Sequence, residues 1–97
     1  MGFSVEFSPD AHKDWSKLEP AIKIRCKKML LKRLENPRVQ SALVSGYDGS
    51  IYRLKISSDG FRLVYKVFDD EAVIYIITVG KREDSEVYRK MRKRLGG

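Results

Sequence analysis

Four basic residues on two neighbouring predicted strands are the part of this sequence best suited to chemistry. Residues 51–68 contain two runs rich in β-branched and aromatic residues, separated by a Ser-Ser-Asp-Gly turn, which predicts an antiparallel hairpin. Because side chains alternate between the faces of a strand, one face of this hairpin, called the cationic face below, carries Arg53, Lys55, Arg62 and Lys66 and no acidic residue. Lys55 is expected opposite or diagonal to Arg62, and like charges in such positions weaken a sheet. The cationic face therefore favours a polyanionic ligand, with an ordinary solvated surface as the alternative.

A cluster of cations can support cleavage of RNA. The RNA 2′-hydroxyl can attack the adjacent phosphate, so a protein has only to align this oxygen, neutralise the phosphorane and help the 5′-oxygen to leave. Arg62 is suited to bind the non-bridging oxygens through two hydrogen bonds. Lys55 is either a general base, since cations beside it disfavour its protonated form, or an electrostatic clamp. With one His, one Cys and no paired-ligand spacing, we expect no metal site and no cofactor.

The basic C-terminal segment, residues 80–95, extends the candidate site. Its early acids and late cations match the dipole of a helix beginning at Asp84 or Ser85, so much of its charge has a structural explanation. Arg82 directly follows the third long strand, 72–79, and topology places it near Arg62, where it would stabilise the leaving oxygen. Tyr88 either stacks on a base or packs beside Met91. Further candidates are Lys81 and Arg89 for phosphate binding and, as weaker general bases, His12, Glu83 and Glu86.

Length and composition indicate a small basic protein. The 97 residues predict one domain, 1–97, with a modest core. Twenty Lys and Arg against thirteen Asp and Glu give a net charge of +7, which favours nucleic acid as the partner. The start of the chain has no apolar signal segment and residues 72–79 are too short to span a bilayer, so we expect a cytoplasmic protein without a membrane partner. The single Cys26 fits a reducing compartment.

The remaining patterns predict an α+β domain of two layers, ordered β-α-α-β-β-β-α, with a mainly antiparallel sheet packed by two N-terminal helices. Alternating apolar residues in 3–7 indicate a first strand, and Ser8 and Pro9 begin a short helix. Pro20 opens a second helix that ends near Asn36.

The second helix has two apolar surfaces. Its core stripe consists of Ile22, Cys26, Met29, Leu30 and Leu34. Ile24 and Leu31 point the other way, among lysines, and form either a partner-binding patch or a packing surface for the first helix.

The sheet face opposite the cations is expected to be the core. Strict alternation assigns to it Tyr52, Leu54, Ile56, Phe61, Leu63, Tyr65, Val67, Val73, Tyr75, Ile77 and Val79. Ile74 and Ile76 then fall on the cationic face and need cover, part of which the last helix can supply.

Several segments resemble the RelE toxin family of bacterial and archaeal toxin–antitoxin systems. They are LENPR at 34–38, YRLKI at 52–56, GFRLVYKV at 60–67 and VGKREDSEVY at 79–88, and the resemblance covers nearly the whole chain. It implies a RelE-like fold and an mRNA endonuclease that enters the 70S ribosome, cleaves the codon in the A site and inhibits translation. It also implies a RelB-like antitoxin as partner, with DNA binding only in the complex with that antitoxin.

The resemblance also assigns roles to residues. The basic pair of the second strand falls on Arg53 and Lys55, the phosphate-binding arginine on Arg62, the arginine after the third strand on Arg82 and the C-terminal tyrosine on Tyr88. RelE itself is expected to carry lysine where this chain has Arg53, and arginine keeps its proton, so a general base must be Lys55 or another group. The alternative function is a non-catalytic ribosome or nucleic-acid binding module that acts with the antitoxin as a corepressor. Clustering of the cations favours the enzyme.

Overall fold

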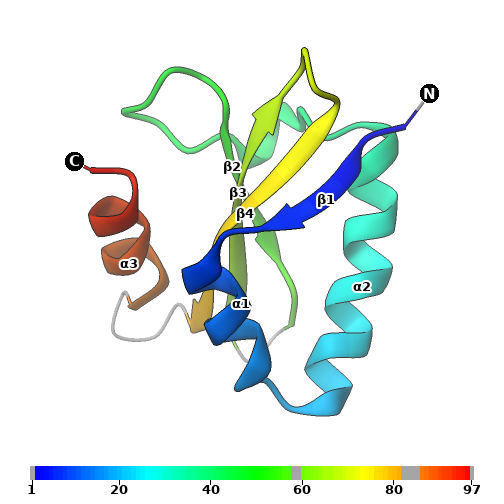
Figure 1. The fold of residues 1–97 in the computed structure, drawn as a ribbon, viewed down its shortest axis with the longest axis vertical. Coiled ribbons are helices and arrows are strands. Elements are labelled where there is room, and N and C mark those ends of the chain that lie inside the picture. The colour runs from blue at the N-terminus through cyan, green and yellow to red at the C-terminus, as the bar shows by residue number, and fades with distance from the viewer. Residues whose placement is uncertain (1, 58–59, 82–85, 97) are drawn as a thin grey trace.

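The elements follow one another in the predicted order. The computed structural model describes residues 2–57, 60–81 and 86–96, and the predicted start of the last helix lies outside these ranges. The elements are β1 (Ser4–Phe7), α1 (Pro9–Ser16), α2 (Pro20–Glu35), a short 3-10 helix (Gln40–Ala42), β2 (Ile51–Lys55), β3 (Phe61–Phe68), β4 (Val73–Lys81) and α3 (Glu86–Arg94). The sheet lies between α2 on one side and α3 on the other (Figure 1). The 3-10 helix lies in the connection between α2 and β2.

Capping residues and prolines set the helix boundaries as predicted. The Ser8 side chain accepts a hydrogen bond from the amide of Ala11 at 3.0 Å, and Pro9 occupies the first turn of α1. Pro20 begins α2, which ends before Asn36. No helix among the described residues combines the length and the apolarity needed to cross a bilayer.

The sheet is mixed, with strand order β1-β4-β3-β2. The pairs β2–β3 and β3–β4 are antiparallel, whereas β1 pairs with β4 in parallel. Gly60, before β3, has a φ of 99°, a conformation that favours glycine. The register places Lys55 directly opposite Arg62. The prediction of a mainly antiparallel α+β sheet is therefore confirmed.

The edge of β4 is covered first by β1 and then by helix α1. Residues 4–7 of β1 pair with 73–76 of β4, and the Ser8 amide then donates to the Ile76 carbonyl at 3.1 Å. From there the chain turns into α1, which lies against the rest of β4. The second half of β4 is thus bordered by side chains of a helix instead of a strand.

A β-bulge in β4 changes the predicted assignment of faces. Val64 pairs with Thr78 but Tyr65 pairs with Ile76, so Ile77 is an extra residue that shifts the alternation by one. The prediction for the half of β4 before the bulge was therefore wrong. Ile74 and Ile76 lie in the main core, whereas Val73, Tyr75 and Ile77 lie on the other face; Val79, beyond the bulge, is in the main core as predicted.

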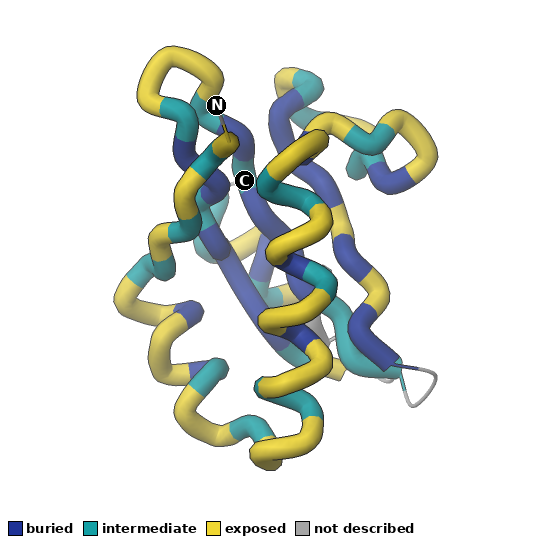
Figure 2. The backbone as a smooth tube through the Cα atoms, turned by 90° about the vertical axis from the view of Figure 1, so that its right-hand side faces the viewer, coloured by how far each residue is buried: buried dark blue, intermediate teal, exposed yellow. Residues whose placement is uncertain are grey.

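Two apolar clusters lie on the two faces of the sheet. The main core joins the strands to α1 and α2 and contains, among its buried members, Ala11, Cys26, Leu30, Tyr52, Leu54, Ile56, Leu63, Tyr65 and Val67. In Figure 2, where α2 faces the viewer, the strands behind it are largely buried while the outer side of this helix is exposed. The second cluster, under α3, contains Ile51, Val64, Ile77 and Met91, with Tyr47, Tyr75 and Tyr88 packed against it.

Candidate RNA-binding and catalytic site

The centre of the site is the pair formed by Lys55 at the end of β2 and Arg62 near the start of β3. The two residues are direct cross-strand partners, with Lys55 exposed and Arg62 half-buried. One guanidinium nitrogen of Arg62 donates to the Phe61 carbonyl at 3.2 Å. On the other side, Arg62 is paired with Gly80, which brings no side chain to the site. Two cations thus lie side by side on one face of the sheet, an arrangement that suits an anionic ligand.

The end of β4 runs beside Arg62. Arg82 and Glu83, like the side chain of Glu86, lie outside the described residues. Lys81 is the partner of Phe61, and its amine lies 5.5 Å from the centre of that ring, on the face opposite Arg62. The register therefore does not bring Lys81 together with Arg62.

Arg53 and Lys66 are held by the connection that precedes β2. The guanidinium of Arg53 donates to the carbonyls of Ser41 at 3.4 Å and Leu43 at 3.5 Å. Lys66 lies four residues from Arg62 along β3, with its amine 4.0 Å from a carboxylate oxygen of Asp48. The connection thus brings an acid to the cationic face, which reasoning from the hairpin alone had not included, and Lys66 lies apart from the central pair.

Helix α3 covers the same sheet face beyond the cations. Tyr88 is half-buried against Met91 and the second cluster, while Arg89 beside it is exposed. A surface pocket of about 450 Å³ next to Tyr88 is lined by Val44, Ser45, Gly46, Tyr47, Met91 and Arg92. Sequence reasoning did not select Tyr47; its signal is that it is the one aromatic residue in the 38–50 connection.

Asp14 is a second residue that sequence reasoning did not select. It lies on α1 with 5% of its side chain exposed, and its carboxylate accepts hydrogen bonds from Lys90 and Arg94 of α3 at 3.2 and 2.6 Å. Burial alone raises the pKa of this carboxyl. The hydrogen bonds from Arg94, the Val79 amide and Lys90, together with the charge of Arg94, lower the pKa by more than burial raises it. The pKa of Asp14 therefore lies below its ordinary value. The sequence gives little signal for this role, because Asp14 stands among polar residues of a short amphipathic helix.

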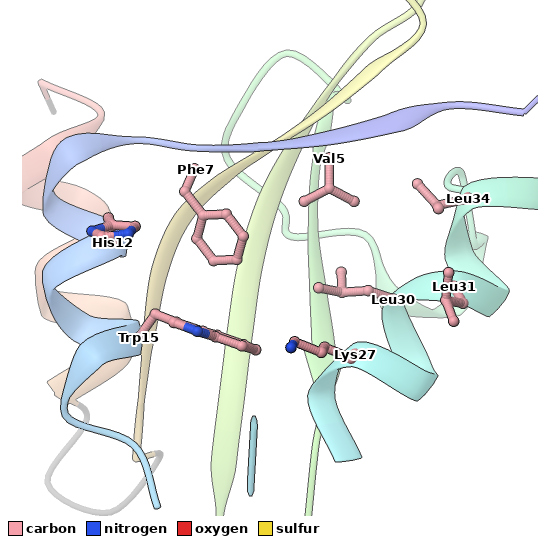
Figure 3. A pocket seen from close by; sticks show the side chains of 8 residues that line it. All are labelled: Val5, Phe7, His12, Trp15, Lys27, Leu30, Leu31 and Leu34. Atoms are coloured by element: carbon pink, nitrogen blue, oxygen red, sulfur yellow. The ribbon is translucent and has the colours of Figure 1, made fainter. Parts of the chain in front are cut away.

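A separate apolar groove lies between α1, β1 and α2. Its volume is about 510 Å³, and Figure 3 shows Phe7 and Trp15 on one side and Leu30 and Leu34 on the other. The rings of Phe7 and Trp15 meet edge to face, with centroids 5.3 Å apart. His12 also lines this groove, so it does not lie on the cationic face.

The two apolar residues on the outer side of α2 are exposed. Ile24 and Leu31 have 61% and 64% of their surface accessible, and Leu31 lines the groove beside Lys27. Neither residue is covered by α1, which was the alternative expectation for them.

The sequence and the fold place the chain in a known class of proteins. Residues 5–86 match the family described as the ParE toxin of type II toxin–antitoxin systems. The chain therefore belongs to the family of ParE- and RelE-type toxins, as the sequence segments predicted.

Within this family the chain is similar to RelE proteins. It is 40% identical to the mRNA interferase toxin RelE of Escherichia coli over 95 residues, which cover 98% of this chain and 99% of the relative. A free double-arginine mutant of E. coli RelE superposes with a TM-score of 0.87 at 39% identity, covering 98% of this chain and 99% of that one. The same mutant in complex with a peptide of the antitoxin RelB has a TM-score of 0.80 at 39% identity, covering 93% and 94%. These likenesses confirm the predicted RelE-like fold.

Proposed function

We propose that this chain is the toxin of a toxin–antitoxin system and an endoribonuclease that cleaves mRNA in the ribosomal A site. The observation that carries the proposal is the direct cross-strand pair of Lys55 and Arg62. Within the described ranges 2–57, 60–81 and 86–96, neither side chain has an ion pair, so both charges are available to phosphate. The 40% identity to a protein named mRNA interferase toxin supports the choice of enzyme over binding module.

In this proposal, the chemistry is attack by the RNA 2′-hydroxyl on the adjacent phosphodiester. Arg62 binds the non-bridging oxygens and stabilises the phosphorane as its charge develops. Lys55 either takes the 2′-hydroxyl proton or holds the phosphate electrostatically while a water molecule takes that proton. Arg82 stabilises the charge on the leaving 5′-oxygen, which then takes a proton from water to become the 5′-hydroxyl. Tyr88 stacks on a base beside the scissile bond. Arg53 and Arg89 contribute attraction for the RNA backbone.

The first test uses the purified chain, programmed ribosomes and an mRNA with a defined codon in the A site. Fragments should end in a 2′,3′-cyclic phosphate and begin with a 5′-hydroxyl. A 2′-deoxy substitution at the cut should abolish cleavage, because it removes the attacking oxygen. Undiminished cutting of the deoxy substrate, or a 5′-phosphate product, would refute the mechanism.

A second test separates catalysis from binding. Arg62→Ala should lower the single-turnover rate by about 100-fold or more with little change in ribosome affinity, because its contact strengthens in the transition state. Arg89→Ala, which removes the same charge from exposed α3, should chiefly weaken affinity. If both variants lose affinity alike and neither loses rate, the chain is a binding module.

We further propose that the antitoxin places an amphipathic segment in the groove between α1 and α2 and over Ile24 and Leu31. Apolar exposure surrounded by Lys27, Lys28 and Lys32 suits a helix with one apolar face and acidic flanks. The RelB complexes of similar RelE proteins support an antitoxin as the class of partner.

The double variant Ile24→Asp/Leu31→Asp tests this surface. Antitoxin affinity measured by calorimetry should fall by at least tenfold, while folding and cleavage persist, since both side chains are already exposed. Lys13→Ala/Lys17→Ala is the matched control, because it lowers the net charge equally at exposed positions of α1 and the following turn. Equal affinities for the wild type and the Asp double variant would refute the proposed surface.

A further inference from the structure

Helix α3 is attached to the rest of the fold at two different surfaces. Tyr88, Met91 and Leu95, spaced three and four residues apart, form the apolar side that packs on the second cluster. Lys90 and Arg94, also four residues apart, form the neighbouring side, and both reach α1. One helix is thus held by a small apolar contact and by an ionic contact next to it.

The ionic contact converges on the buried Asp14. One carboxylate oxygen lies 2.6 Å from a guanidinium nitrogen of Arg94, which has only 19% of its side chain exposed. The other oxygen lies 3.2 Å from the amine of Lys90. Arg94 also donates to the Ile77 carbonyl at 3.0 Å and faces Asp10 at 3.7 Å. Charged hydrogen bonds shielded from water in this way are stronger than exposed ones.

Asp14 is itself fixed to the sheet. Its carboxylate accepts from the Val79 amide at 3.2 Å and from the Thr78 hydroxyl at 3.3 Å, at the edge of β4 that β1 no longer covers. The strand therefore fixes the position of the carboxylate, and Lys90 and Arg94 of α3 can bind it only if the helix lies at one place beside β4. Because Arg94 also donates to the carbonyl of the bulged Ile77, the position of the helix along β4 is fixed.

We propose that Asp14, Lys90 and Arg94 form an ionic latch that sets the position of Tyr88 relative to the cationic pair of Lys55 and Arg62. The three are positioning residues for the proposed RNA cleavage, so this inference rests on the proposed function. The latch acts through α3: Lys90 lies two residues and Arg94 six residues beyond Tyr88 on the same helix. When the latch opens, Asp14 keeps its two contacts to β4 while α3 loses its ionic contacts to Asp14.

Arg94→Met tests the latch without disturbing the core, since it keeps an unbranched apolar stem at the end of the last helix. Amide hydrogen exchange of residues 86–96 should become about 10- to 100-fold faster, and exchange of the sheet should stay unchanged. The 3-fluorotyrosine NMR signal of Tyr88, assigned by its loss in Tyr88→Phe, should shift toward the solvent-exposed position. Arg94→Lys should give intermediate values, and Lys93→Met, which removes an exposed charge one residue away, should behave like the wild type.

The kinetic test is a double-mutant cycle with Tyr88. Arg94→Met should lower the single-turnover cleavage rate on ribosomes about tenfold in the wild type and have no further effect in Tyr88→Ala, because it acts through that side chain. Equal losses in both backgrounds, or α3 exchange and a Tyr88 signal unchanged by Arg94→Met, would overturn the latch. A wild-type chain that cleaves no RNA would instead refute the proposed function, and the exchange and fluorine measurements would then decide on the latch alone.

Discussion

Removing the charge of Lys55 is expected to stabilise the fold while it removes activity. Lys55 lies directly opposite Arg62 across β2 and β3, so Lys55→Gln relieves a repulsion that exists in every unliganded molecule. Two unit charges about 6 Å apart in water repel by about 0.7 kcal/mol, within the range of about 0.2–1 kcal/mol for cross-strand pairs. We therefore expect an increase of about 0.5 kcal/mol in the free energy of unfolding.

Urea denaturation followed by circular dichroism at two salt concentrations measures this effect. The gain should be full at about 20 mM salt and vanish near 1 M, where the screening length is about 3 Å. Lys55→Arg keeps the charge and should show no gain, and Lys55→Gln should show none in an Arg62→Gln background. A gain that persists at high salt, or one that survives removal of Arg62, would refute the electrostatic explanation. Cleavage by Lys55→Gln should be strongly impaired under all conditions.

Tyr65→Phe should lower the free energy of unfolding, measured in urea, by about 1–3 kcal/mol. The reason is that the buried hydroxyl donates to the Pro37 carbonyl at 2.6 Å and accepts from Arg33 at 2.8 Å. An unchanged midpoint of the urea transition would contradict this prediction. Stability should fall as the pH drops below about 4, because the pKa of Asp14 is lower in the folded chain and the unfolded chain therefore binds more protons there. Asp14→Asn should flatten this part of the urea-derived pH profile, and an unaltered profile would count against it. Cys26 should react with a thiol reagent only after unfolding, since burial raises its pKa to about 12. Rapid labelling of the native chain would contradict this prediction.

The fold could be predicted from the sequence wherever a local rule decides the structure. Ser8, Pro9 and Pro20 act through their own backbone and side chains, so the helix starts were predictable. Alternation along the two strands placed Lys55 and Arg62 on one face, opposite or diagonal to each other, and the structure shows that they are directly opposite.

Sequence reasoning failed where the structure depends on distant partners. The bulge at Ile77 changes the faces of half a strand, yet no residue type in the run 73–79 marks it, because every side chain there is apolar or is Thr78. The role of Asp14 depends on residues more than sixty positions away, and charge patterning within α3 alone assigned Lys90 and Arg94 to the helix dipole. The parallel place of β1 beside β4 likewise has no local signal.

The position of β2 at the rim of the sheet has a consequence for how the chain behaves in concentrated solution. Leu43 pairs with Tyr52 at the start of β2, but within the described part of the chain no strand lies beside residues 53–55. Exposed strand rims recruit other chains into continuous sheets, and charged side chains are a common defence against this. Arg53 and Lys55 stand at this rim, so the same charges that attract RNA also keep copies of the chain apart. A variant in which Arg53 and Lys55 are replaced by neutral residues is expected to be more stable to unfolding and yet to self-associate more readily.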